Sequence, residues 1–80
     1  MIASVVLVLY GIDSEKYNNI ADELSVHLWC DEIDDEEGII YLYDPDKNPE
    51  MVAGEAKSIV NGFGLVYGRD YRIYVEYNKV

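Results

Sequence analysis

SVVLVLY, at residues 4–10, is a continuous apolar run rich in β-branched residues. An unbroken run of this kind is typical of a strand covered on both faces, because a half-exposed strand alternates apolar and polar residues. Gly11 then interrupts the run. The sequence therefore predicts a central β-strand that ends before Gly11.

A helix is predicted directly after this strand. Asp13 or Ser14 can cap its first turn, where Glu15 also favours a helix N-terminus. Apolar residues then recur at helical spacing and form one stripe: Tyr17, Ile20, Ala21, Leu24 and Leu28. The opposite face is polar and acidic: Asn18, Asn19, Asp22 and Glu23.

From Val26 the apolar period changes to two, which predicts a strand. One of its faces would carry Val26, Leu28 and Cys30, and the other His27, Trp29 and Asp31. Residues 34–38, DDEEG, predict a hairpin tip, because Gly38 is free to adopt a positive φ. Residues 39–43, IIYLY, predict the returning strand.

The next segment predicts a turn and a second helix. Residues 44–47, DPDK, are turn formers, Asn48 is a suitable N-cap and Pro49 suits the first helical position. One face of this helix is apolar: Val52, Ala56, Ile59, Val60 and Phe63. The pair at 61–62, Asn-Gly, predicts its end.

Residues 71–77, YRIYVEY, alternate strongly and predict the last strand, while residues 65–67 are a candidate for a short extra strand that turns back at 68–70. The predicted order is strand, helix, strand, strand, helix, strand. This order resembles the ferredoxin-like α+β plan, a four-stranded antiparallel sheet with two helices on one face. Right-handed crossovers place the first and third strands at its centre. Because many unrelated functions share this plan, it implies little about activity.

Length and charge narrow the functional classes. Eighty residues predict a single domain over 1–80, and sixteen Asp and Glu against six Lys and Arg give a net charge of −10. Residues 1–46 hold twelve acids and one base, whereas residues 47–80 hold four acids and five bases. This charge opposes direct binding to nucleic acid or to an anionic membrane, and neither is expected as a partner.

Catalysis and cofactor binding find little support in the residue types. With a single cysteine, Cys30, and a single histidine, His27, the chain can form neither an internal disulfide nor a tetrahedral Cys/His zinc site. No spacing suggests a nucleophile with its base, and no glycine-rich loop precedes a helix. We therefore expect neither an enzyme nor a cofactor.

One alternative use of the acidic residues is metal binding. Asp44, Asp46, Asn48 and Glu55 fall at the first, third, fifth and twelfth positions of a calcium-loop pattern. Pro49, however, stands at the sixth position, where such a loop needs glycine for its sharp turn. A turn followed by a helix cap explains the same residues, and no metal site is predicted.

The acidic segment is the strongest anomaly, since six of the seven residues 31–37 are carboxylates. Residues on one face of a strand recur at about 6.6 Å, and duplex DNA carries a charge about every 1.7 Å of its axis. Clustered carboxylates can thus approach the charge density of a nucleic-acid backbone, although a solvated turn is the plainer reading. The expected partner contacts are Asp31, Glu32, Asp34, Asp35, Glu36 and Glu37, supported by Asp44, Asp46, Asp22 and Glu23.

Eight tyrosines are the second anomaly. If Ile40 and Leu42 point to the helices, the open face of the sheet receives Ile39, Tyr41 and Tyr43, together with Trp29, His27 and Tyr74. This placement resembles that of RNA-recognition domains, but here the third strand follows acids instead of basic residues. Trp29, Tyr41 and Tyr43 are therefore expected to anchor a protein partner or a second copy.

These features favour a small acidic interaction protein that blocks a basic nucleic-acid-binding site on a nuclease or defence complex by mimicry. Inhibitors encoded by phages against host defences, such as anti-CRISPR proteins, are the class it resembles in size and charge. The alternative is a homodimeric ACT-like regulatory module with an effector pocket near Gly11. The apolar run at 2–10 lacks the features of a signal peptide, so a cytoplasmic location is expected, in the host cytoplasm if the chain is phage-encoded.

Overall fold

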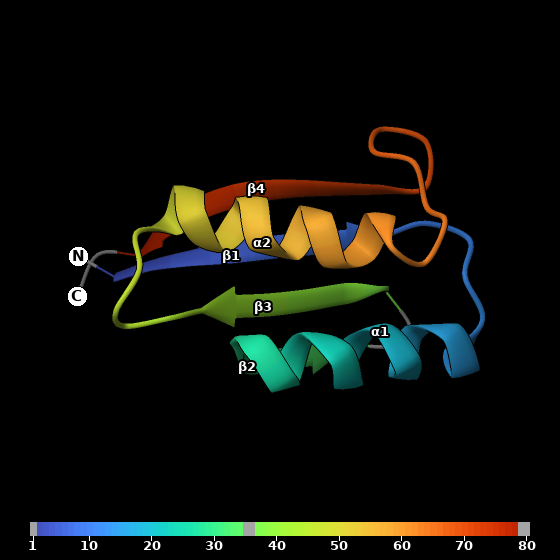
Figure 1. Cartoon of the computed structure of the whole chain (residues 1–80), viewed down its shortest axis with the longest axis horizontal. Helices are drawn as coiled ribbons and strands as arrows, with labels where there is room; N and C mark the ends of the chain where they lie inside the picture. Colours follow the sequence, from blue (N-terminus) through green and yellow to red (C-terminus); the bar gives the residue numbers. More distant parts are fainter. Residues whose placement is uncertain (1, 35–36, 79–80) are drawn as a thin grey trace.

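The structure is a computed structural model that describes the backbone of residues 2–34 and 37–78 and the side chains of residues 4–30 and 37–77 (Figure 1). Its elements follow the predicted order: β1 (Ile2–Leu9), α1 (Ser14–His27), β2 (Trp29–Asp34), β3 (Ile39–Tyr43), α2 (Pro49–Asn61) and β4 (Tyr71–Asn78).

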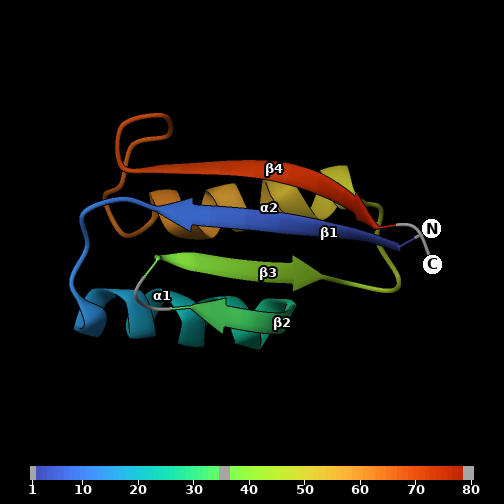
Figure 2. The same ribbon diagram turned by 180° about the vertical axis from the view of Figure 1, so that it is seen from behind.

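The four strands form one sheet in the order β2-β3-β1-β4, in which all neighbouring strands are antiparallel. Both helices cover one face, and Figure 2 shows the other face, over which no helix lies. The α+β prediction with β1 and β3 in the centre is confirmed, and the arrangement is consistent with a ferredoxin-like fold. The hydrophobic core lies between the two helices and the covered face of the sheet. Its buried residues include Val5, Leu7, Leu9, Tyr17, Ile20, Leu24, Ile40, Leu42, Val52, Ala56, Val60 and Tyr71.

Helix α1 begins at the predicted cap. The Asp13 carboxylate accepts a hydrogen bond of 2.7 Å from the backbone N–H of Lys16. The apolar stripe faces the sheet, and the buried Tyr17 hydroxyl donates to the carbonyl of Ile39 at 3.0 Å. The acidic face of the helix, with Asp22 and Glu23, is left in solvent.

The prediction of a strand from Val26 is wrong, because α1 continues through His27 and β2 starts at Trp29. Val26 is 75% exposed and Leu28 is buried at the helix C-cap, where its N–H donates to the Leu24 carbonyl. Leu28 fits two patterns: it follows Leu24 at helical spacing, and it alternates with Cys30 as in a strand. The pattern therefore did not define the boundary between α1 and β2.

Helix α2 confirms its predicted start and end. The Asn48 side chain accepts from the N–H of Met51 at 2.9 Å, Pro49 opens the helix and Gly62 is its C-cap. Gly62 keeps a right-handed φ of −61°, and the chain first turns to a positive φ at Gly64. The helix therefore ends where the Asn-Gly pair predicts, and the left-handed turn of the chain follows two residues after the cap.

Replacing the α2 cap gives a first stability test. Asn48→Ala leaves the Met51 N–H without its side-chain acceptor, and we expect it to lower the free energy of unfolding by about 1 kcal/mol. Asn48→Asp keeps an acceptor at the same place and should stay within about 0.5 kcal/mol of the parent. Urea unfolding followed by circular dichroism measures both, and equal losses for the two variants would show that the cap hydrogen bond is not what matters.

The candidate strand at 65–67 is not a strand. Tyr67 makes only an isolated bridge to Tyr71, and the segment forms a loop beside the start of β4 (Figure 1). The Asp70 carboxylate closes this loop by accepting from the Val66 N–H at 2.8 Å, and the hydrogen bond from Arg69 lowers the pKa of Asp70. Local hydrogen bonds thus hold residues 66–70 in place of a sheet ladder.

Candidate acidic interaction surface

The elements that carry most of the acids lie on one side of the molecule. β2 is one edge of the sheet and α1 packs on that side, whereas β4 is the other edge and α2 packs against β1 and β4 (Figure 1). We call α1, β2 and the two turns that flank β3 the acidic side. Of the described basic residues, Lys57, Arg69 and Arg72 belong to α2, the 62–70 loop and β4, whereas the acidic side holds only Lys16 on α1 and Lys47 in the turn after β3. The linear asymmetry in charge is therefore also an asymmetry in space.

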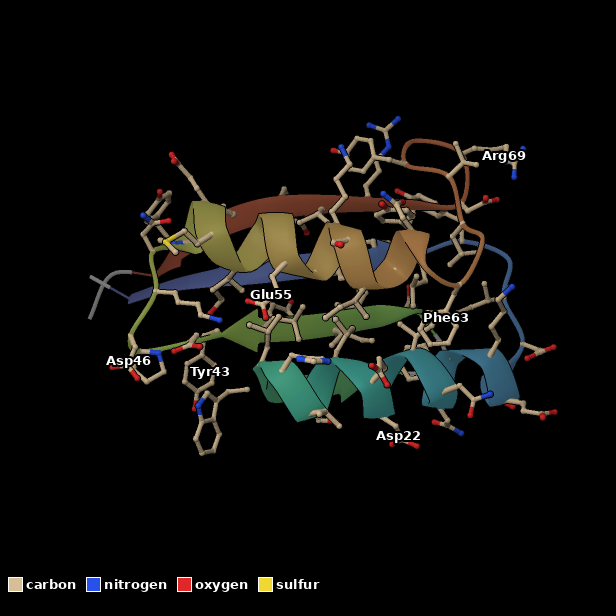
Figure 3. All side chains as sticks on the ribbon, in the orientation of Figure 1. Asp22, Tyr43, Asp46, Glu55, Phe63 and Arg69 are labelled. Atoms are coloured by element: carbon tan, nitrogen blue, oxygen red, sulfur yellow. The ribbon has the colours of Figure 1, made fainter. Side chains whose placement is uncertain are left out.

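The described carboxylates on this side are largely in solvent. Asp22, Glu23, Glu37 and Asp46 are exposed. Figure 3 shows Asp22 and Asp46 at the edge of the molecule opposite Arg69. The Glu23 carboxylate lies 3.4 Å from Nε2 of His27, one helical turn away. Three separate segments, α1 and the turns before and after β3, thus contribute carboxylates to the acidic side.

The central part of the predicted site is described only in its backbone. Asp31, Glu32 and Asp34 belong to β2, where Glu32 pairs with Tyr41 and Asp34 with Ile39. A register shift between Cys30 and Glu32 leaves Asp31 as the extra residue of a bulge. Their side chains, and the whole of Asp35 and Glu36, lie outside the described residues.

The Asp44 carboxylate is engaged by neighbouring residues of its own turn. Its carboxylate accepts from the Asp46 N–H at 2.9 Å and lies 3.6 Å from Nζ of Lys47. Lys47 also donates to Glu55 at 2.7 Å, and this hydrogen bond raises the pKa of Lys47. Asp44 is thus partly neutralised, while Asp46 remains available to solvent.

The calcium-loop alternative finds no support in this geometry. Asp44 and Asn48 accept from backbone N–H groups, and Glu55 pairs with Lys47, so their oxygens serve the turn and the α2 cap. Among the described residues no group of three or more His, Cys, Asp and Glu is placed to hold a metal ion.

Aromatic side chains gather on the face of the sheet that no helix covers. Trp29 and Tyr43 are paired across β2 and β3, and their rings are stacked with centroids 6.3 Å apart and planes 21° apart. Trp29 is 61% exposed, which leaves its indole available for contact. The predicted placement of Trp29, Tyr41 and Tyr43 agrees with the register, but His27 lies on α1 and not on this face.

Val6 shows how this face is organised. Its side chain is fully buried although it points away from both helices, since its neighbours Val5 and Leu7 face the core. Tyr41 on β3 and Tyr74 on β4 stand directly opposite Val6 in the two flanking strands. We infer that the two rings cover Val6, so part of this aromatic face has a structural role. The continuous apolar run of β1 was the sequence signal for this coverage.

A hollow of about 410 Å³ lies at the C-terminal end of α1 and is lined by residues 25–30. Cys30 lines it, and burial raises the pKa of this thiol, with a smaller opposing effect from a hydrogen bond with Ser25. A raised pKa keeps the thiol protonated and weakly nucleophilic. The hollow is at the other end of α1 from Gly11, where the ACT-like alternative expects its effector, and that alternative remains a prediction.

Comparison of this chain with known protein families, curated proteins and solved structures gives no match. Within the described part of the chain, neither helix has the length and apolar composition needed to cross a membrane.

Proposed function

We propose that this protein occupies a basic nucleic-acid-binding site on another protein, with its acidic side in the place of a nucleic-acid backbone. The observation that carries the proposal is the placement of α1, β2 and the turns around β3 along one side, away from Lys57, Arg69 and Arg72. A charge that served solubility alone would need no such separation.

The dimensions support this proposal. The molecule is 34 Å along its longest axis, and one turn of B-DNA rises about 34–36 Å. Such a turn carries about 20 phosphate charges, against twelve carboxylates in residues 1–46. The protein can therefore offer about half the charge of a duplex over a comparable length. Because the folded scaffold is already rigid, little conformational entropy is lost when it binds.

Apolar anchoring completes the proposed surface. Trp29 and Tyr43 are stacked at the β2 edge, the same edge that carries Asp31, Glu32 and Asp34. Aromatic side chains carry much of the binding energy in compact interfaces, whereas clustered charge mainly increases the association rate and selects the partner. We propose that Trp29, Tyr41 and Tyr43 anchor the partner beside the electrostatic contacts. The partner class is a nuclease or defence complex with a cationic groove, and a phage-type inhibitor such as an anti-CRISPR protein is the matching biological class.

The experiment is capture of the partner followed by kinetics at two salt concentrations. Proteins retained by the immobilised chain at low salt are identified, and the association rate of the best-retained one is measured at about 0.05 M and about 0.5 M salt. We expect the rate to fall by about tenfold or more, because steering by exposed charge is screened. A rate that does not change with salt, or a partner with no basic surface, would refute the proposal.

A further inference from the structure

The two edge strands of the sheet differ in how their free edges are protected. β2 carries a bulge and three carboxylates, both of which discourage pairing with another strand. β4 pairs with β1 in an unbroken register from Asn78 to Tyr71 and contains neither a bulge nor a proline. An exposed, regular edge strand is a template for a further strand.

The hydrogen bonds around β4 show which backbone groups point outward. Tyr71 accepts at its carbonyl from the N–H of Gly68 at 2.8 Å, and Gly68 belongs to the loop outside the sheet. On the inner side, Asp70 accepts from the Tyr10 N–H at 2.8 Å. Successive residues of a strand point their backbone N–H and C=O groups to opposite sides. The backbone groups that point away from β1 are therefore those of Tyr71, Ile73, Val75 and Tyr77.

The 62–70 loop covers only the beginning of this edge. It occupies the Tyr71 carbonyl, and the Tyr67 hydroxyl donates to the Ile73 carbonyl at 3.4 Å. Beyond that point, the N–H of Ile73 and the N–H and C=O groups of Val75 and Tyr77 have no partner among residues 2–34 and 37–78. The open edge therefore runs from residue 73 to residue 77, with Val75 at its midpoint.

We propose that β4 pairs with β4 of a second copy of this chain, antiparallel and centred on Val75. Two identical open segments overlap completely only when their midpoints meet, so the loop at one end and the end of β4 at Asn78 together set the register. In this register Val75 exchanges two hydrogen bonds with its equivalent, and each Ile73 N–H donates to the carbonyl of Tyr77 in the other copy. The two four-stranded sheets then form a single eight-stranded sheet with a two-fold axis between the two β4 strands.

The side chains of β4 are complementary to themselves in this register. Arg72 and Glu76 lie on the face without helices, since they alternate with the core residues Tyr71, Ile73 and Val75. Arg72 of each copy is a diagonal neighbour of Glu76 in the other, at about 7–8 Å between backbones, which long side chains span. The symmetry makes this ion pair twice. On the helix side, the exposed Tyr77 comes opposite the half-buried Ile73 of the second copy.

The charge distribution also selects this edge. Two copies with a net charge of −10 repel each other, and the repulsion is weakest where their acidic sides are farthest apart. Pairing through β4 puts the acidic sides at the two ends of the joined sheet. This inference stands independently of the proposed function, and it would give the dimer two acidic sides facing in opposite directions.

Sedimentation velocity over a range of concentrations tests the pairing. We expect a mass that rises from one chain to two with concentration, and Val75→Pro should leave a single chain, because it removes an outward N–H without touching the ladder to β1. A single-chain mass for the parent up to about 1 mM would overturn the proposal. So would a dimer that Val75→Pro leaves unchanged while its circular dichroism matches the parent.

Charge exchange at two positions gives a control that does not depend on tolerance of proline. In the register of β4 with β1, Arg72 stands opposite Val8 and Glu76 opposite Ser4, so neither has a charged cross-strand partner within its own sheet. Arg72→Glu should weaken dimerisation by about tenfold, and adding Glu76→Arg should restore it to within about threefold. Failure of the double variant to recover would show that the two side chains do not meet.

Discussion

Gly38→Ala is expected to lower the free energy of unfolding by about 3 kcal/mol, whereas Gly11→Ala should lower it by about 1 kcal/mol. Both glycines have a positive φ, +70° for Gly38 and +63° for Gly11, and a left-handed backbone costs an alanine about 1–2 kcal/mol. At Gly38 an added Cβ would also meet the carbonyl oxygen of Leu9, while at Gly11 it meets no atom within 4 Å.

The contact at Gly38 cannot relax easily, because both partners are held by the sheet. Leu9 is the last residue of β1, and its N–H donates to the Gly38 carbonyl at 2.7 Å. A domain of this size has a total stability of about 4–12 kcal/mol, so the expected loss is a large part of it. Thermal and urea unfolding measure both variants. Equal losses would mean that backbone strain alone, and not the close approach of the hairpin to β1, makes glycine necessary at residue 38.

Reversal of the hairpin charges is expected to have the largest effect on binding. Replacing Asp34, Asp35, Glu36 and Glu37 with Lys should lower the affinity for the captured partner by about a thousandfold, since each of the four charge reversals costs about 1 kcal/mol in total. Circular dichroism should show the parent fold. Unchanged affinity would remove the mimicry proposal.

A matched pair of helix variants separates position from net charge. Asn18→Lys with Asp22→Lys changes α1 by three charges, and Glu50→Lys with Ser58→Lys changes α2 by the same amount; all four side chains are exposed. We expect at least a tenfold loss of affinity for the α1 variant and less than threefold for the α2 variant. Similar losses would indicate that total charge, and not the acidic side, determines binding.

The topology could be predicted from the sequence because the signals were redundant. The apolar run of β1, the stripe that carries Tyr17, and the Asn48-Pro49 start of α2 each indicate one element. Once the order of elements is known, the handedness of crossovers leaves few sheets to consider. Errors arose where one residue suits two patterns, as Leu28 does at the end of α1.

The parts that could not be predicted depend on contacts between distant segments. The apolar run of β1 indicated that Val6 is covered on both faces, but not that Tyr41 and Tyr74, 35 and 68 residues further along the chain, stand opposite it. Two further features depend on three-dimensional geometry that the residue spacing does not predict. One is the ion pair between Asp44 and Lys47, and the other is the loop that covers only the first part of the β4 edge. The excess of acidic residues in the first half of the chain was visible in the sequence. That the elements carrying them lie on one side of the molecule became clear only from the strand order.

Competition with nucleic acid tests the proposed mimicry most directly. A fluorescent duplex is titrated with the captured partner at fixed salt, with increasing amounts of this protein present. If the acidic side takes the place of a nucleic-acid backbone, the apparent dissociation constant of the duplex rises in proportion to the concentration of the protein, and no complex contains all three molecules. A duplex affinity that stays constant, with a ternary complex forming, would contradict the proposal.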